Sequence, residues 1–263
     1  MVREKLVALE GILKTFGRVV VAYSGGVDST FLLFVAWRVL GGNAQGILID
    51  TPLLPPFKKE EALRVALTLG LPVEVLSVDV LKNKDVVANG PERCYFCKKH
   101  LFGEILALVP NAIVCDGTNM DETKEFRPGL RAKEELGVRS PLCEVGLTKG
   151  EIRELSRELG LPTWNKPSYT CLATRIPQGV ELTRELLERI GKLEHFLEAL
   201  GFSGFRVRHH GVIARLELEE KDFPLVLSPE KRRTILATFQ EAGYRFVTVD
   251  LRGYQKGSMD GRT

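Results

Sequence analysis

The fold is decided by the stretch Val19-Val20-Val21-Ala22-Tyr23-Ser24-Gly25-Gly26-Val27-Asp28-Ser29-Thr30. Its β-branched residues predict a buried parallel strand, and the apolar run over 31–40 predicts the helix that follows. Between them, Gly25 and Gly26 allow the backbone to approach a ligand closely. The first turn of a helix carries unpaired amides and a partial positive charge, so this turn suits a phosphate group.

Strands and helices alternate along the chain after this turn. Buried strands are expected over 46–50, 73–78 and 111–115, with helices over 57–69 and 148–159. The alternation predicts an α/β fold with a doubly wound parallel sheet. Ligands bind such sheets beyond the carboxyl ends of the strands, and the glycine turn lies at such an end.

The pattern of elements changes after about Gly179. Two helices, a pair of β-rich runs and a last strand are expected, over 183–200, 228–242, 205–219 and 246–251. We therefore expect an α/β domain over 1–179 and a smaller α+β domain over 180–263, with a role in substrate binding or oligomerisation.

The composition limits the class of protein. A chain of 263 residues with 44% hydrophobic and 27% charged side chains is typical of a globular protein. Five cysteines are too few and too unevenly spaced for a disulfide framework, which indicates a reducing compartment. The longest apolar run, over 31–37, is too short to cross a bilayer, and Glu4 and Glu10 argue against a signal peptide. We therefore expect a cytoplasmic protein without a membrane partner.

The segment Ser24-Gly25-Gly26-Val27-Asp28-Ser29 is neither a Walker A loop nor a dinucleotide fingerprint. It resembles the PP-loop of the ATP pyrophosphatases, which cleave ATP between its α and β phosphates and adenylate a substrate. The resemblance implies that the loop holds the pyrophosphate and that Asp28 helps to hold Mg²⁺. The implied nucleotide-binding residues in this stretch are Ala22, Ser24, Gly25, Gly26, Asp28 and Ser29. The alternative is a glycine-rich turn that binds no ligand.

A second polar loop, Asp116-Gly117-Thr118-Asn119-Met120-Asp121, follows the strand expected over 111–115. It resembles the segment with which ATP pyrophosphatases close over the nucleotide, and this resemblance implicates Gly117, Asn119 and Asp121. Thr51 directly follows the strand expected over 46–50, and its position alone suggests a place near the adenosine. Because Asn and Asp are also common turn formers, an ordinary loop remains the alternative.

Three of the five cysteines are candidates for chemistry. Cys94 and Cys97 form a CxxC pair among basic residues, a setting that lowers the pKa of thiols. Cys171 lies in a Pro- and Ser-containing loop between the two expected domains. Cys115 and Cys143 lie in or beside apolar strands, so we expect both to be buried packing residues.

Several chemistries fit three cysteines. A thioredoxin-like redox pair is disfavoured, because the CxxC does not open the first helix of a thioredoxin-like βαβ pattern. A structural zinc site would need a fourth ligand such as His100. A [4Fe-4S] cluster held by three thiolates would leave one iron open to a sulfide or a substrate. Three unrelated thiols are the remaining alternative.

Nearly the whole chain resembles the ATP-dependent sulfur-insertion enzymes that make the nickel-pincer nucleotide cofactor of lactate racemase. The matching motifs are the PP-loop, Arg93-Cys94-Tyr95-Phe96-Cys97-Lys98, Asp116 to Asn119, Arg127-Pro128-Gly129, and Lys166-Pro167-Ser168 to Cys171-Leu172-Ala173-Thr174-Arg175. The resemblance implies that a carboxylate of pyridinium-3,5-biscarboxylate mononucleotide is adenylated and converted to a thiocarboxylate. It also implies a small-molecule nucleotide substrate and a hexamer assembled through the C-terminal region.

The same resemblance assigns the remaining site residues. It implies catalytic roles for Asp28 and Cys171, and a [4Fe-4S] sulfur carrier on Cys94, Cys97 and Cys171. In the alternative mechanism Cys171 gives up its own sulfur and becomes dehydroalanine. Arg206, Arg208 and Glu217 match a substrate-phosphate site, although the alternation of the two arginines also fits a solvent-exposed strand face.

Two other functions stay open at this point. A PP-loop tRNA thiolase combines the same loop with three cysteines, but a net charge of +3 argues weakly against a nucleic-acid partner. A regulator that binds ATP without catalysis would have no need of Asp28 together with reactive cysteines.

Overall fold

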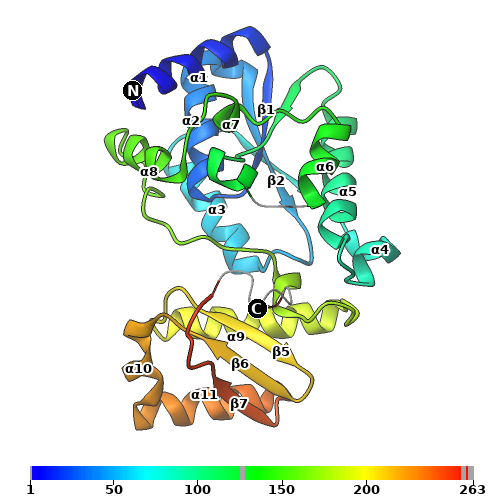
Figure 1. The fold of residues 1–263 in the computed structure, drawn as a ribbon, viewed down its shortest axis with the longest axis vertical. Coiled ribbons are helices and arrows are strands. Elements are labelled where there is room, and N and C mark those ends of the chain that lie inside the picture. Colours follow the sequence, from blue (N-terminus) through cyan, green and yellow to red (C-terminus); the bar gives the residue numbers. More distant parts are fainter. Residues whose placement is uncertain (1, 125–127, 256–258, 260–263) are drawn as a thin grey trace. The chain divides into compact units, whose positions relative to one another are not determined.

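The computed structural model describes residues 2–124, 128–255 and 259 (Figure 1). Two compact units make up the chain. The first comprises 1–51, 58–80 and 92–167, and the second comprises 52–57, 81–91 and 168–263. The domain division expected at residue 179 stays a prediction.

The first unit is built on a four-stranded parallel sheet with the strand order β3-β2-β1-β4. The strands are β1 (Val19–Tyr23), β2 (Ala44–Asp50), β3 (Val73–Ser77) and β4 (Ile113–Cys115). In register, Val19 pairs with Ala44 of β2 and with Ile113 of β4. Because all strands run the same way, their carboxyl ends meet at one edge. The predicted α/β fold is confirmed.

Helices cover both faces of this sheet (Figure 1). On one face, Val20 and Ile47 pack against Phe102 and Ile105. Gly46 points to the opposite face, where a Cβ on it would lie 2.7 Å from Leu33 Cδ2. The helices and turns are α1 (Val2–Phe16), α2 (Val27–Leu40), η1 (Gly41–Asn43), α3 (Pro56–Thr68), α5 (Arg93–Leu108), η3 (Met120–Lys124), α6 (Pro128–Glu135), α7 (Pro141–Glu144) and α8 (Lys149–Glu158).

The second unit contains a three-stranded sheet with the order β5-β6-β7. β5 (Arg206–His210) and β6 (Ile213–Glu217) are antiparallel, and β7 (Phe246–Val249) runs parallel to β6. The other elements are η2 (Val80–Lys82), α4 (Lys84–Val87), η4 (Leu172–Arg175), α9 (Arg184–Ala199), η5 (Glu220–Asp222), α10 (Phe223–Leu227) and α11 (Pro229–Glu241). Among the described residues, no helix has the length and apolar content needed to span a bilayer.

The core of the second unit contains a charged pair. Arg175 Nε donates to Glu194 Oε1 at 2.7 Å, and both side chains are fully buried. Tyr169 donates to the other carboxylate oxygen at 2.8 Å, and the backbone amide of Val207 donates to Oε1 at 3.1 Å. Burial alone would raise the pKa of Glu194, but the Arg175 charge and these hydrogen bonds outweigh burial and lower it. The pair therefore joins η4, α9 and β5.

We expect Arg175→Met to lower the free energy of unfolding by about 3–5 kcal/mol, because it leaves the Glu194 carboxylate buried and unpaired. The matched control is Arg189→Met, which removes an arginine from an i,i+4 pair with the exposed Glu185. The control variant should stay within about 0.5 kcal/mol of the unmodified protein. Urea denaturation followed by circular dichroism measures both. Equal midpoints for the two variants would contradict a stabilising role of the pair.

Candidate functional site

The turn between β1 and α2 is closely packed. Gly25 has a left-handed backbone with φ +67°, and a Cβ on it would lie 2.4 Å from the Cβ of Ala62 in α3. Glycine is therefore required, because any other residue would add both strain and a clash. Ser29 Oγ accepts from the amide of Ser24 at 3.1 Å and lies 2.9 Å from Ser24 Oγ, so the turn closes on itself.

The first turn of α2 presents amides and a carboxylate together. Gly26 is the N-cap and supplies no side-chain hydrogen bond to these amides, which are the groups that bind phosphate at a helix N-terminus. Asp28 Oδ1 accepts from Asn119 Nδ2 at 3.3 Å, and Asp28 Oδ2 accepts from Lys149 Nζ. The structure thus brings Asp28 and Asn119 together from distant parts of the chain.

The loop over 116–121 contacts the start of α2 directly. A Cβ on Gly117 would lie 2.9 Å from the backbone nitrogen of Ser29, so only glycine lets the two backbones approach this closely. Asp121 Oδ2 accepts from the backbone amide of Lys149 at 2.8 Å, which ties the loop to the start of α8. Predicted residues from two loops therefore lie at the same edge of the sheet.

Ala22 and Thr51 lie at the carboxyl ends of neighbouring strands. Ala22 is half-buried in β1, and Thr51 directly follows β2. The Thr51 hydroxyl is buried and has no hydrogen-bond partner among the residues that the structure describes. Buried hydroxyls are normally paired, so this atom is suited to a polar group of a ligand.

A buried ion pair holds the 116–121 loop from behind. Lys133 Nζ donates to Asp116 Oδ2 at 2.7 Å, to Thr118 Oγ1 at 2.6 Å and to Ser140 Oγ at 3.1 Å. Ser140 in turn donates to Asp116 Oδ1 at 2.7 Å. Burial would raise the pKa of Asp116, but the Lys133 charge and the hydrogen bonds from Ser140 and Thr118 lower it instead. Asp116 is therefore ionised at neutral pH and fixes the loop.

We expect Lys133→Met to lower the free energy of unfolding at pH 7 by about 3–5 kcal/mol, since Asp116 would stay buried without its partner. A carboxylate whose folded-state pKa is lowered contributes stability above its unfolded pKa and loses it as pH falls through the folded value. Without Lys133, burial raises the folded-state pKa of Asp116, so the gap in unfolding free energy between variant and unmodified protein should narrow steadily as pH falls from 7 and Asp116 becomes protonated in the variant. Urea denaturation across this pH range measures the gap, with Lys99→Met as the exposed control. A gap independent of pH would contradict the role given to Asp116.

The paired cysteines lie in the first turn of α5. Cys94 is exposed and Cys97 is partly buried, and their spacing of three residues puts them on one face of the helix. Arg93 Nη2 lies 3.4 Å from Cys94 Sγ, so a cation stands beside one thiol as the sequence predicts. Cys171 is the N-cap of η4 in the second unit and is partly buried.

The other two cysteines differ from each other. Cys115 is buried in β4 as predicted, and burial raises the pKa of its thiol. Cys143 in α7 is partly exposed, so its prediction as a buried packing residue is wrong. Cys143 lies in the short helix α7 and not in a strand, and the buried residues of that helix are Pro141 and Leu142.

The described residues contain no group of three or more His, Cys, Asp or Glu side chains that could hold a metal ion. His100, considered as a fourth zinc ligand, lies 3.7 Å from Glu104. Cys94 and Cys97 belong to the first unit and Cys171 belongs to the second. The donors fit an iron–sulfur cluster in their chemistry, since all three are thiols with some exposure.

The two arginines of the expected phosphate site are buried. Arg206 and Arg208 on β5 are each 4% exposed, so a solvent-exposed strand face is wrong for them. Arg208 Nη2 donates to Glu217 Oε2 at 2.7 Å. Arg206 Nη2 donates to the carbonyl of Ser168 at 2.7 Å, and its guanidinium lies over the Tyr254 ring at 4.6 Å. Burial, with the nearby Arg175 charge, lowers the pKa of Arg206.

A third arginine joins this group. Arg215 lies directly opposite Arg208 in the β5–β6 register and donates to Glu217 Oε1 at 3.2 Å and to Asp250 Oδ2 at 2.9 Å. The Nε atoms of both arginines are buried and have no partner among the described residues. Donors of this kind, grouped on one face, suit an anion with several acceptor oxygens.

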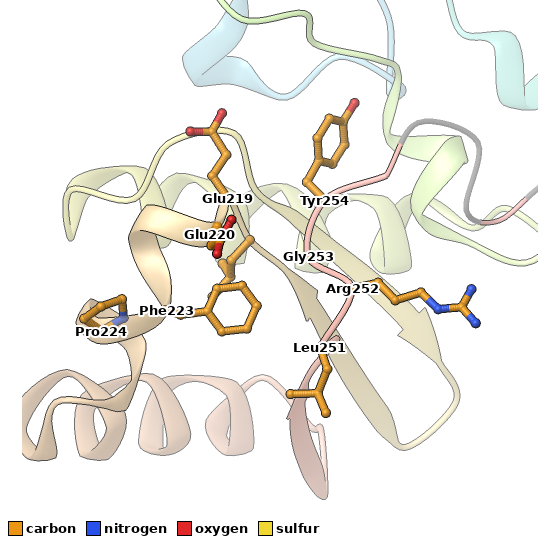
Figure 2. A pocket seen from close by; sticks show the side chains of 9 residues that line it. Glu219, Glu220, Phe223, Pro224, Leu251, Arg252, Gly253 and Tyr254 are labelled. Carbon is orange, nitrogen blue, oxygen red and sulfur yellow. The ribbon is translucent and has the colours of Figure 1, made fainter.

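A separate pocket of about 830 Å³ lies in the second unit (Figure 2). It is lined by residues from η5 and α10 and by the segment 251–254 that follows β7. None of the predicted site residues lines it. Tyr254 connects it to the arginine group, since its ring borders the pocket and also contacts Arg206.

Three lysines that contact the glycine turn, the start of α2 or the 116–121 loop have no role assigned from the sequence: Lys133, Lys149 and Lys166. Lys149 follows the capping residue Thr148, and its position at the start of a helix is a usable signal. Lys133 has no such signal, because its partner Asp116 lies 17 residues away, whereas Lys166 is the first residue of the matched motif that ends at Arg175. Of the predicted motifs, Arg127 lies outside the described residues.

Comparison with known proteins adds independent findings. No protein-family model matches the chain. The chain is 39% identical to an uncharacterised protein of Synechocystis sp., over 99% of this chain and 98% of that protein. It is 36% identical to the pyridinium-3,5-bisthiocarboxylic acid mononucleotide synthase of Lactiplantibacillus plantarum, over 97% of this chain and 94% of that protein. A glutamine-hydrolysing GMP synthase of Chlamydia muridarum is 30% identical over 59% of this chain and 34% of that protein.

Proposed function

This chain belongs to the family of the pyridinium-3,5-bisthiocarboxylic acid mononucleotide synthase of Lactiplantibacillus plantarum, and we propose that it is an ATP-dependent sulfur transferase. Similarity to that synthase along nearly the whole of both chains carries the proposal. The uncapped first turn of α2 supports it, because that turn suits a phosphate and lies at the carboxyl ends of the strands. The partial similarity to a GMP synthase is consistent with an ATP-using first unit.

The proposed reaction converts a carboxylate of pyridinium-3,5-biscarboxylate mononucleotide into a thiocarboxylate. A carboxylate is a poor acyl donor, so it first needs a better leaving group. Its oxygen attacks the α phosphorus of ATP, the bond to the β phosphate breaks, and pyrophosphate leaves. A sulfur nucleophile then attacks the acyl carbon, and AMP leaves. The products are the thiocarboxylate, AMP and pyrophosphate.

The first unit would bind and activate ATP. The amides at the start of α2 would hold the departing pyrophosphate, with the hydroxyls of Ser24 and Ser29 beside them. The carboxylates of Asp28 and Asp121 are the oxygen ligands that Mg²⁺ prefers. Magnesium bound there would neutralise charge on the phosphates. Gly117, Asn119 and Thr51 would contact the rest of the nucleotide.

The second unit would hold the phosphate of the substrate. Arg206 and Arg208 are buried cations, and the Nε of Arg208 still lacks an acceptor among the described residues. Glu217 orients Arg208 through a 2.7 Å ion pair. A phosphate offers the acceptor oxygens that such a donor group lacks.

We propose Cys94, Cys97 and Cys171 as ligands of a [4Fe-4S] cluster. A cluster held by three thiolates would supply an iron with an open position at which sulfide can bind. Cys94 is exposed, and Arg93 Nη2 lies 3.4 Å from its Sγ, so this proposed ligand is accessible and has a cation beside it. The alternative keeps the same reaction but takes the sulfur from Cys171 itself. We also propose a cytoplasmic homo-oligomer, a hexamer by resemblance, without a nucleic-acid or membrane partner.

Asp28→Asn should reduce substrate-dependent pyrophosphate release at least about 100-fold, since losing a metal ligand at the phosphates removes some 2.7 kcal/mol of transition-state stabilisation. The measurement is pyrophosphate release from ATP, with and without pyridinium-3,5-biscarboxylate mononucleotide. Asp85→Asn changes an exposed aspartate in the same way and is the matched control. If the unmodified protein releases no pyrophosphate when the substrate is added, the proposed function is wrong.

The sulfur source is tested on protein prepared without oxygen. If the three cysteines hold a cluster, each single alanine variant should lose iron, acid-labile sulfide and turnover with added sulfide. These variants are Cys94→Ala, Cys97→Ala and Cys171→Ala. Cys143→Ala keeps all three properties and is the control. Mass spectrometry after turnover would then show intact Cys171. A loss of about 34 Da at Cys171 in proportion to product, with full single-turnover activity in Cys94→Ala, would instead identify Cys171 as the sulfur donor.

A further inference from the structure

Lys166 makes contacts at the glycine turn that no proposed role yet uses. It lies in the first unit, and its side chain is 16% exposed. Its Nζ donates to the backbone carbonyl of Gly25 at 2.9 Å and lies 3.1 Å from Glu61 Oε1. The ammonium therefore lies between a loop carbonyl and a carboxylate of α3.

The position of the Gly25 carbonyl decides where the next amide points. In a trans peptide the carbonyl of one residue and the N–H of the next point in opposite directions. Lys166 lies on the carbonyl side of the peptide that joins Gly25 to Gly26. The N–H of Gly26 therefore points to the other side, where its acceptor is Ser24 Oγ at a distance of 3.4 Å. This bond is long for an N–H donor, so the amide can exchange it for a phosphate oxygen.

The turn needs an external partner to keep this orientation. Glycine at both positions makes rotation of the intervening peptide sterically easy. A rotated peptide would present the Gly25 carbonyl oxygen, rather than the Gly26 amide, to a phosphate. In that orientation the largely buried Lys166 would also lose its carbonyl partner, which disfavours the rotation.

Glu61 fixes the lysine in turn. Its Oε2 accepts from Lys58 Nζ at 2.9 Å, while its Oε1 faces Lys166. Burial would raise the pKa of Glu61, but the hydrogen bond from Lys58 and the Lys166 charge lower it. Glu61 also belongs to the helix whose Ala62 excludes a side chain at Gly25. One turn of α3 thus supports the loop by packing and by charge.

We infer that Lys166 is a positioning residue that keeps the glycine turn ready for the pyrophosphate part of ATP. Glu61 holds Lys166 in place, and neither side chain is required to touch the nucleotide. The inference rests on the proposed use of ATP. It also predicts that binding of the β and γ phosphates of ATP depends on Lys166, whereas binding of AMP does not.

The test compares binding of ATP, pyrophosphate and AMP by calorimetry with the full chain and Mg²⁺. Lys166→Met should weaken binding of ATP and pyrophosphate by about tenfold or more, the effect of losing a charge-assisted hydrogen bond. AMP affinity should change by less than about twofold. Lys166→Arg keeps a cationic donor and should restore most of the ATP affinity. The matched control is Lys59→Met, which removes a lysine of α3 that forms an ion pair with Asp50 of β2.

A second variant separates positioning from direct phosphate contact. Glu61→Gln should weaken pyrophosphate binding if Glu61 acts by holding Lys166. If Lys166 were itself a phosphate ligand, removing the negative charge of Glu61 would strengthen binding, and that result would overturn the inference. Equal losses for ATP and AMP in Lys166→Met, with a lower melting temperature, would also overturn it by showing a purely structural role. If the unmodified protein binds neither ATP nor pyrophosphate, the proposed function is wrong, and the inference that rests on it is wrong too.

Discussion

The contact of the Gly25 backbone with Ala62 is the constraint on which the candidate site depends. It places the end of β1 against α3 with no room for a side chain, at a residue whose backbone is left-handed just before α2 begins. The parallel sheet places this contact at the candidate site, because the carboxyl ends of β1, β2 and β4 lie at the same edge of the sheet. Three loops therefore meet where the amides of α2 have no side-chain cap.

Buried ion pairs hold candidate functional segments in both units. Lys133 and Asp116 fix the loop that contacts α2. Arg175 and Glu194 fix η4, the turn whose N-cap is Cys171. Buried pairs are poor sources of net stability, because desolvation offsets most of their attraction. Their effect here is geometric, since each partner can make its hydrogen bonds in only one arrangement of the surrounding loops.

The arginine group of the second unit, Arg206, Arg208 and Arg215, differs from these pairs because its cations outnumber its carboxylates. Arg208 and Arg215 face each other across β5 and β6, which would be repulsive without the carboxylate of Glu217 between them. Three arginines and two carboxylates, Glu217 and Asp250, leave an excess of positive charge. The Nε donors of Arg208 and Arg215 have no partner among the described residues. Such a group is more stable with an anion than without one. This feature agrees with the phosphorylated substrate proposed above.

The sequence by itself determined the parallel α/β fold, the glycine turn and the loop with Asn119. These features depend on local patterns: β-branched runs predict strands, and glycines mark the close approaches of the backbone. It also placed Arg206 and Arg208 on one strand, but the same alternation fits an exposed face, so only the tertiary structure decided that they are buried. Cys143 shows the converse, since it is partly exposed although its neighbours Pro141 and Leu142 are buried.

Only the tertiary structure decided the charge partners. Lys166 meets Gly25 across 141 residues, and Lys149 meets Asp28 across 121 residues. A lysine in the sequence carries no mark of the carbonyl or carboxylate it will meet, because its long side chain has many rotamers and its partner is set by the packing of helices. Periodicity reports which face of an element is buried. It does not report which polar groups the packed faces bring together, and this information exists only in the folded chain.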